Sequence, residues 1–246
     1  MADADELWEY WRKRSDSYEE RYVDPSTVLE REKRVRLATA LELAQLDGAD
    51  TVGDLGVGSG RLFAHLPDNV SQIIGVDFSA PMIQGARENI SNVAYVQGTA
   101  ESLPLRTGSL DVLFCLGVVG HMNSDAVPAA IDEMARVLRP GGSLILSFAN
   151  ARSPFRRLRR VCIAARSGTH YTTYRPEYIE EILRQAGCHI RSRRYLTYST
   201  GLLDTQANLW LAAVLDNHLV TNDLLGPLAM TWVVQASVRE GSVAFD

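Results

Sequence analysis

Three glycines at alternate positions constrain the fold of this chain more than any other feature. They end the stretch TVGDLGVGSG, residues 51–60. A short apolar run with one acid precedes them, and the apolar spacing from Arg61 to Leu66 is helical. The pattern therefore predicts a strand, a tight loop and a helix. Because glycine permits positive φ and has no Cβ, a ligand can lie against this loop, beside the unpaired N–H groups that begin the helix.

The acids around the loop indicate the chemistry of that ligand. Asp54 comes just before the glycines, and Asp77 ends a second apolar run 17 residues after Gly60. The spacing Gly-x-Gly-x-Gly differs from the dinucleotide pattern Gly-x-Gly-x-x-Gly, and an acid here would repel a pyrophosphate. A carboxylate that ends the second strand of a βαβ unit accepts hydrogen bonds from both ribose hydroxyls. The residues predict a nucleoside ligand with a positively charged tail.

These stretches resemble motifs I and II of the class I S-adenosylmethionine-dependent methyltransferases, of the small-molecule, methyltransferase-11-like kind. The resemblance covers roughly residues 50 to 150, with a looser similarity to about 200, and continues through GTAESLP (98–104), LDVLF (110–114) and EMARVLRPGG (133–142). It implies an α/β, Rossmann-like fold with helices on both faces of a seven-stranded, mostly parallel sheet. The last strand is expected to be antiparallel and to lie between strands five and six. The implied cofactor is S-adenosylmethionine, with S-adenosylhomocysteine as product.

The resemblance also implies which residues contact the cofactor. Those assigned to the methionyl portion are Asp54, Gly56, Gly58 and Gly60. Asp77 is assigned to the ribose. Those assigned to the adenine and its edge are Phe78, Met82, Thr99, Ala100 and Glu101. Thr99 stands where family members commonly have Asp, so its hydroxyl or the backbone of Ala100 is expected to replace that contact.

The segment after the fourth predicted strand is expected to face the transferred methyl group, because ligands bind beyond the carboxyl ends of parallel strands. Leu116 and Gly117 are assigned to the cofactor there. His121 is the candidate catalytic base for a hydroxyl or activated-carbon acceptor, since its ordinary pKa is near neutrality. The alternative is that His121 only lines the site or orients the loop. A sulfonium methyl group is already activated, so in-line positioning supplies much of the catalysis and no metal is expected.

Alternating strands and helices from residue 51 to 149 predict a parallel sheet within one methyltransferase domain, residues 1–246. Residues 50–150 are expected to form its cofactor-binding core. Aromatic residues among charges in residues 1–48 favour either a helix over the sheet edge or a helical lid. In the lid, Tyr18 or Tyr22 contacts the methionyl end or the substrate. Residues 151–175 and 200–228 are expected to be substrate-cap insertions.

Composition limits the partners of the protein. The net charge of −5 argues against a general nucleic-acid binder. No apolar stretch approaches the roughly 20 residues that a bilayer-spanning helix needs, and the first residues lack the pattern of a signal peptide. We therefore expect a cytoplasmic protein without an integral membrane segment. The three cysteines, Cys115, Cys162 and Cys188, have neither zinc-site nor disulfide-framework spacing. The sequence leaves the oligomeric state open.

Eleven arginines and only three glutamates lie between residues 151 and 194. Three interpretations stay open: a solvated face, a receptor for an anionic group of the substrate, and a basic amphipathic helix on an anionic membrane. The favoured function is methyl transfer to oxygen or nitrogen of a small-molecule acceptor. One alternative is C- or O-methylation of a quinone, isoprenoid or lipid at a membrane surface. The other is a non-catalytic cofactor-binding module.

Overall fold

The computed structural model describes residues 28–47, 50–157, 171–197, 210, 214 and 218–240. The strands are β1 (Thr51–Leu55), β2 (Gln72–Asp77), β3 (Ala94–Gln97), β4 (Leu110–Leu116), β5 (Leu138–Ala149), β6 (Cys188–Leu196) and β7 (Thr231–Val238). The α-helices are α2 (Val28–Ala44), α3 (Ala80–Asn89), α4 (Val127–Val137) and α6 (Pro176–Gln185). Short 3-10 helices occur at Phe63–His65, Val119–His121, Ser124–Ala126 and Gly226–Leu228.

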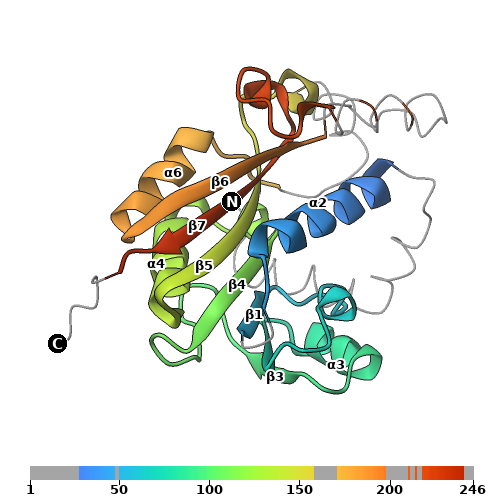
Figure 1. Ribbon diagram of the computed structural model, residues 1–246, viewed down its shortest axis with the longest axis vertical. Coiled ribbons are helices and arrows are strands. Elements are labelled where there is room, and N and C mark those ends of the chain that lie inside the picture. The colour runs from blue at the N-terminus through green and yellow to red at the C-terminus, as the bar shows by residue number, and fades with distance from the viewer. Residues whose placement is uncertain are drawn as a thin grey trace.

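The seven strands form one sheet in the order β3-β2-β1-β4-β5-β7-β6 (Figure 1). β1 pairs in parallel with β2 and β4, and β4 pairs in parallel with β5. β7 is antiparallel to both of its neighbours, β5 and β6. The predicted Rossmann-like fold is confirmed, including the antiparallel last strand between strands five and six.

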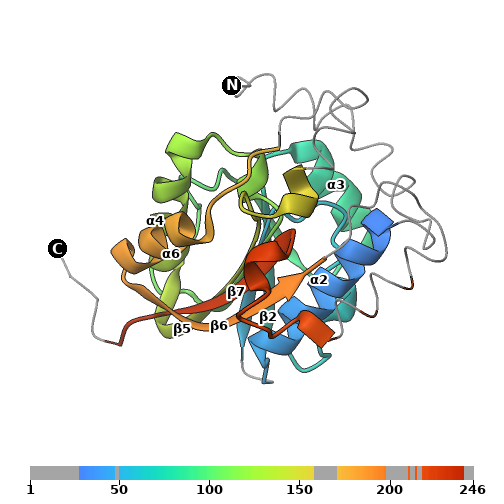
Figure 2. The same cartoon turned by 90° about the horizontal axis from the view of Figure 1, so that it is seen from above.

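Helices cover both faces of the sheet (Figure 2), with α4 and α6 on one face and α2 and α3 on the other. Neighbouring side chains of β4 alternate between the two layers. Val112 and Phe114 pack in the cluster that contains α2, whereas Leu113 and Cys115 pack in the cluster that contains α4 and α6. A parallel strand covered on both faces reads as a continuous apolar run, which explains the sequence LDVLFCL.

The prediction of an α-helix after the glycine loop (residues 56–60) is wrong. The segment from Arg61 to Leu66 forms only a 3-10 helix at Phe63–His65, and Leu66 is already extended, with φ −71° and ψ 150°. Pro67 explains this result, because a proline disfavours the helical conformation of the residue before it. Too few residues then remain to offset the cost of nucleating an α-helix.

The parts of the chain expected to form the lid and the caps are described only in part. Residues 1–27, with Tyr18 and Tyr22, lie outside the described residues, as do 158–170 with Cys162 and most of 198–217. α2 belongs to the described end of the expected lid and packs on the sheet beside β4 to β7. Among the described residues, no helix has the length and apolar character needed to cross a membrane.

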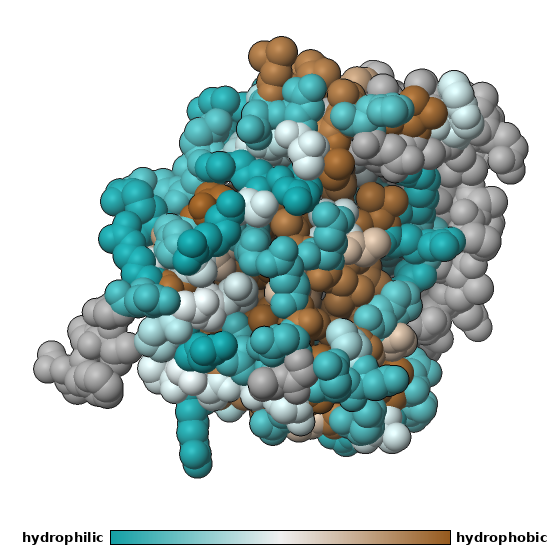
Figure 3. Space-filling model, viewed as in Figure 1, coloured by the Kyte–Doolittle hydropathy of each residue, from teal (hydrophilic) through white to brown (hydrophobic). Residues whose placement is uncertain are grey.

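The described surface differs in polarity from one end to the other. Hydrophilic side chains cover the side of the view where α6 lies, and a hydrophobic area is exposed at the top (Figure 3). The segment around the 3-10 helix Gly226–Leu228 lies at the top of the same view (Figure 1). Leu224 is 86% exposed and Leu228 is 39% exposed in this segment. An apolar surface therefore borders the carboxyl edge of the sheet.

Candidate functional site

The glycine loop turns sharply at the carboxyl end of β1. Gly56, Gly58 and Gly60 have φ angles of 82°, 55° and 80°, in the region that side chains disfavour. The Gly56 N–H donates a hydrogen bond of 2.8 Å to the carbonyl of Val76 in β2. A Cβ on Gly56 would lie 2.3 Å from Cγ2 of Val118, so the loop after β4 fills the space that a side chain would need.

Two buried carboxylates flank this loop. Asp77 ends β2 and accepts hydrogen bonds from the N–H groups of Ser79 (2.9 Å) and Gly58 (3.3 Å). Asp54 lies in β1 and is 5% exposed. Burial, and then the charge of Asp77, raise the pKa of Asp54 well above its ordinary value. Burial also raises the pKa of Asp77, although its backbone hydrogen bonds oppose the shift.

The Asp54 carboxylate is the unbalanced group of the site. Among the described residues it takes part in no hydrogen bond and no ion pair. A buried carboxylate without a partner is costly, and a cation placed beside it removes that cost. The residues therefore fit a ligand with an amino or sulfonium group next to Asp54, a ribose next to Asp77, and a backbone-to-ligand contact at the glycines.

The residues assigned to the adenine lie where β2 and β3 end side by side, since Asp77 pairs with Gln97 in register. Phe78 is half-buried, and its carbonyl accepts a hydrogen bond of 3.0 Å from Nε2 of Gln97. Met82 is buried in the first turn of α3, which Ser79 caps. In the segment after β3, Ala100 is buried whereas Thr99 and Glu101 are exposed. The structure thus brings this group to one edge of the sheet.

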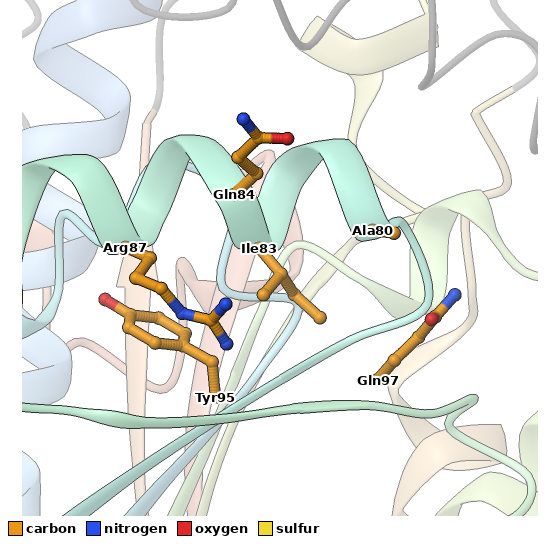
Figure 4. Close-up of a pocket in the computed structure, with 6 residues that line it drawn as sticks. All are labelled: Ala80, Ile83, Gln84, Arg87, Tyr95 and Gln97. Atoms are coloured by element: carbon orange, nitrogen blue, oxygen red, sulfur yellow. The ribbon is translucent and has the colours of Figure 1, made fainter.

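A cavity of about 520 Å³ adjoins this edge between α3 and β3 (Figure 4). The lining residues are Ala80, Ile83, Gln84, Arg87, Tyr95 and Gln97. Among the lining residues, Arg87 lies over Tyr95, with its Cζ 5.7 Å from the centre of the Tyr95 ring (Figure 4). The Tyr95 hydroxyl donates to the carbonyl of Ile90 at 3.0 Å, which ties α3 to β3.

The residues expected to face the methyl group lie in and around the loop after β4. Leu116 ends β4, and Gly117 follows it with φ 82°. His121 ends the 3-10 helix Val119–His121, and its ring lies edge-on to Tyr171 with 4.7 Å between ring centres. The Thr172 N–H donates a 2.7 Å hydrogen bond to the carbonyl of Gly120, which fixes Tyr171 over this loop.

Arg36 and Tyr171 are residues of this site that the sequence reasoning missed. The guanidinium of Arg36, from α2, lies flat against Gly117, with Nη1 3.2 Å from the position of a Cβ there. Burial raises the pKa of Tyr171, and the positive charges of Arg36 and Arg156 oppose that rise. A sequence signal for Arg36 lies in the first half of α2, EREKRVR. It carries charges where a helix packed on a sheet is expected to be apolar.

An ion pair joins α2 to the glycine loop. Glu30 is buried in the first turn of α2, and its carboxylate accepts two hydrogen bonds from the guanidinium of Arg61. In one of them, Nη1 of Arg61 donates to Oε2 of Glu30 at 2.9 Å. Lys33 lies one turn further along. Burial and the neighbouring Arg36 lower the pKa of Lys33 to about 7.

Neither a metal centre nor a disulfide is present among the described residues. They contain no group of three or more His, Cys, Asp and Glu side chains placed to hold a metal ion. Cys115 and Cys188 are buried free thiols.

Comparisons with known proteins agree with this architecture. The methyltransferase domain family, Methyltransf_11, matches residues 53–146. An uncharacterized methyltransferase of Bacillus subtilis, YcgJ, is 32% identical over 132 residues, covering 52% of this chain and 50% of that protein. The demethylmenaquinone methyltransferase of Beutenbergia cavernae is 34% identical over 98 residues, 40% of each chain. The matched regions thus span half or less of these curated relatives.

A solved structure covers almost the whole chain. Magnesium protoporphyrin IX methyltransferase from Synechocystis, determined with bound S-adenosylhomocysteine, superposes with a TM-score of 0.70 at 17% identity, covering 96% of this chain and 100% of that one. At this identity the likeness shows the fold. The family match and the sequence relatives support a class I S-adenosylmethionine-dependent methyltransferase domain that includes residues 53–146.

Proposed function

We propose that this protein transfers the methyl group of S-adenosylmethionine to oxygen or nitrogen of a small-molecule acceptor. The observation that carries the proposal is the buried carboxylate of Asp54, which has no hydrogen bond or ion pair among the described residues and lies beside a loop with three glycines. When bound, the cofactor supplies an electrophilic methyl group on a positively charged sulfur. Asp54 balances the positive charge of the methionyl portion, and Asp77 accepts hydrogen bonds from the ribose hydroxyls.

The loop from Gly117 to His121 orients the reacting groups. Val118 packs into the space above Gly56, so this loop and the glycine loop keep a fixed separation. Holding donor and acceptor in line removes several kcal/mol, about 7 or more in favourable cases, from the barrier. His121 takes the acceptor proton, and the edge-on contact with Tyr171 holds its ring. We further propose that residues 1–48 act as a lid and that 151–175 and 200–228 cap the acceptor.

Binding and turnover separate this proposal from a non-catalytic module. Calorimetry with S-adenosylhomocysteine measures cofactor binding, and a product assay with S-adenosylmethionine over candidate hydroxyl and amine acceptors measures transfer. His121→Ala is expected to lower turnover at least about tenfold with unchanged cofactor affinity. His65→Ala, at an exposed histidine outside the site, is the matched control. Unchanged turnover in His121→Ala would rule out His121 as the catalytic base. Cofactor binding without any methylated product would favour the non-catalytic cofactor-binding module.

A second candidate function is methylation of a quinone, isoprenoid or lipid at a membrane surface. The observation that favours it is the exposed apolar segment with Leu224 and Leu228 at the carboxyl edge of the sheet. A curated relative is named as a demethylmenaquinone methyltransferase, which is consistent with such an acceptor. Comparing water-soluble hydroxyl acceptors with a short-chain quinol in the same product assay tests it. Product formed only from the quinol would replace the first proposal with the second.

A further inference from the structure

A second cavity opens at the carboxyl end of β5, beyond the residues that the family match covers. Its volume is about 490 Å³. Its polar lining comes from Asn150, Arg152, Arg156, Arg157, Thr173 and Arg175. Four guanidinium groups surround this concave surface, and two of them, those of Arg152 and Arg156, are paired with Glu177 and Glu32. We name this cavity the arginine cleft.

The backbone of the arginine cleft is fixed by the sheet. The Tyr174 N–H donates to the carbonyl of Ala149 at 2.9 Å, and the Ala151 N–H donates to the carbonyl of Tyr174 at 2.8 Å. The Asn150 side chain donates to the carbonyls of Pro227 (3.0 Å) and Ala229 (2.8 Å). The two walls of the cleft therefore extend β5 and keep their spacing.

Two of the four arginines already have protein partners. Arg156 donates from Nε to the carbonyl of Met230 at 3.0 Å, and Nη1 of Arg152 lies 2.8 Å from Glu177. The guanidinium groups of Arg157 and Arg175 are exposed, and neither takes part in an ion pair or hydrogen bond of the described residues. The cleft thus keeps two uncompensated positive charges on opposite walls.

The cleft is connected to the methyl-facing loop. Cζ of Arg156 lies 5.8 Å from the centre of the Tyr171 ring, and Tyr171 in turn contacts His121. We propose that the arginine cleft binds a phosphate or carboxylate group of the methyl acceptor, with Arg157 and Arg175 as its principal ligands. This inference rests on the proposed function for the identity of the bound molecule. Guanidinium forks suit both oxyanions, and the concave shape favours a compact anion over an extended surface.

The test uses inorganic pyrophosphate and glutarate as probes of the full chain, by calorimetry with and without S-adenosylhomocysteine. Arg157→Gln and Arg175→Gln are each expected to weaken binding of the preferred probe about tenfold, and the double variant about 100-fold. Arg106→Gln is the matched control, because Arg106 is exposed and precedes β4. It therefore lies near the amino end of that strand, whereas the cleft lies at the carboxyl end of β5. Arg106→Gln is expected to change binding by less than about twofold. Melting curves check that each variant is folded.

The outcomes assign the anion or overturn the inference. Tighter binding of pyrophosphate identifies a phosphate group, and tighter binding of glutarate identifies a carboxylate. Flotation with phosphatidylglycerol vesicles identifies a lipid headgroup as the source if the double variant loses vesicle binding and Arg106→Gln does not. Equal losses in Arg106→Gln and the cleft variants overturn the inference, as does binding of none of these probes. The probes are also measured without cofactor, so a failure to bind S-adenosylhomocysteine would affect the proposed function alone.

Discussion

Two regions along the carboxyl edge of the sheet carry side chains of opposite charge, and we call them the acidic end and the basic end. Beside β1 and β2, Asp54 and Asp77 are buried around a loop with glycines at positions 56, 58 and 60. Beyond β5, four arginines line an open cleft. The acidic end suits a cationic donor and the basic end suits an anionic acceptor, with Gly117 to His121 between them. In the proposed function, one edge of the sheet would therefore separate the two reactants by charge.

The largest expected effect is at the acidic end. Asp77→Asn removes the negative charge of the carboxylate that accepts hydrogen bonds from the Gly58 and Ser79 N–H groups and, in our proposal, from the ribose hydroxyls. We expect S-adenosylhomocysteine to bind about 50-fold more weakly, as charge-assisted hydrogen bonds of this kind contribute about 1.5–3 kcal/mol each. Calorimetry measures it, with the exposed Asp68→Asn as control. An affinity for S-adenosylhomocysteine within about threefold of the wild type would contradict the assignment of the acidic end to the cofactor.

Asp54→Asn is expected to affect binding and stability in opposite directions. Cofactor affinity should fall about tenfold, because the cation loses its partner. The raised pKa of Asp54 means that the free wild-type protein loses stability as pH rises through that pKa, since the folded state then releases a proton it had retained. The variant should therefore melt higher at neutral pH and show a flatter pH profile. A lower melting temperature of the free variant across the pH range would contradict this interpretation.

The sequence predicted the acidic end and missed the basic chemistry near the methyl group. Glycines with positive φ and an acid at a strand end are local requirements of chain geometry, so they appear as a motif around Gly56 and Asp77. Arg36 and Tyr171 come from segments far apart in the chain, and each lies against the loop after β4, Arg36 at Gly117 and Tyr171 at His121. No short sequence pattern predicts contacts between segments so far apart. The helix expected after Arg61 failed because Pro67 outweighed the apolar spacing.

Gly117→Ala tests the region between the two ends. We expect a loss of about 1–2 kcal/mol in the free energy of unfolding, because φ is 82° and the new methyl group presses on Arg36. Gly85→Ala in α3 is the matched control, since a Cβ there meets nothing within 4 Å. That variant should gain up to about 1 kcal/mol from the helical propensity of alanine. Urea denaturation measures both, and a shift in the same direction for both would contradict the prediction.

The smallest effect is expected at Lys33, on α2. Its pKa falls from 10.5 to about 7 on folding, so the unfolded chain holds the extra proton between these values and stability rises with pH across that window. Lys33→Met removes the cost of burying the charge. The variant should gain about 0.5 kcal/mol at pH 6, after discounting for partial exposure and nearby acids, and lose this advantage as pH approaches 10. If the melting temperatures of the variant and the wild type differ by the same amount at pH 6 and at pH 9, this prediction is contradicted.

The contact between Val118 and Gly56 has a consequence for how the protein tolerates change. The isopropyl group of Val118 occupies the space that the absent side chain of Gly56 leaves, so the two loops touch directly, in addition to the pairing of β1 with β4. A larger side chain at position 56 or 118 would displace one loop relative to the other. Because the proposed donor and acceptor sites lie on these two loops, we expect both positions to tolerate little change.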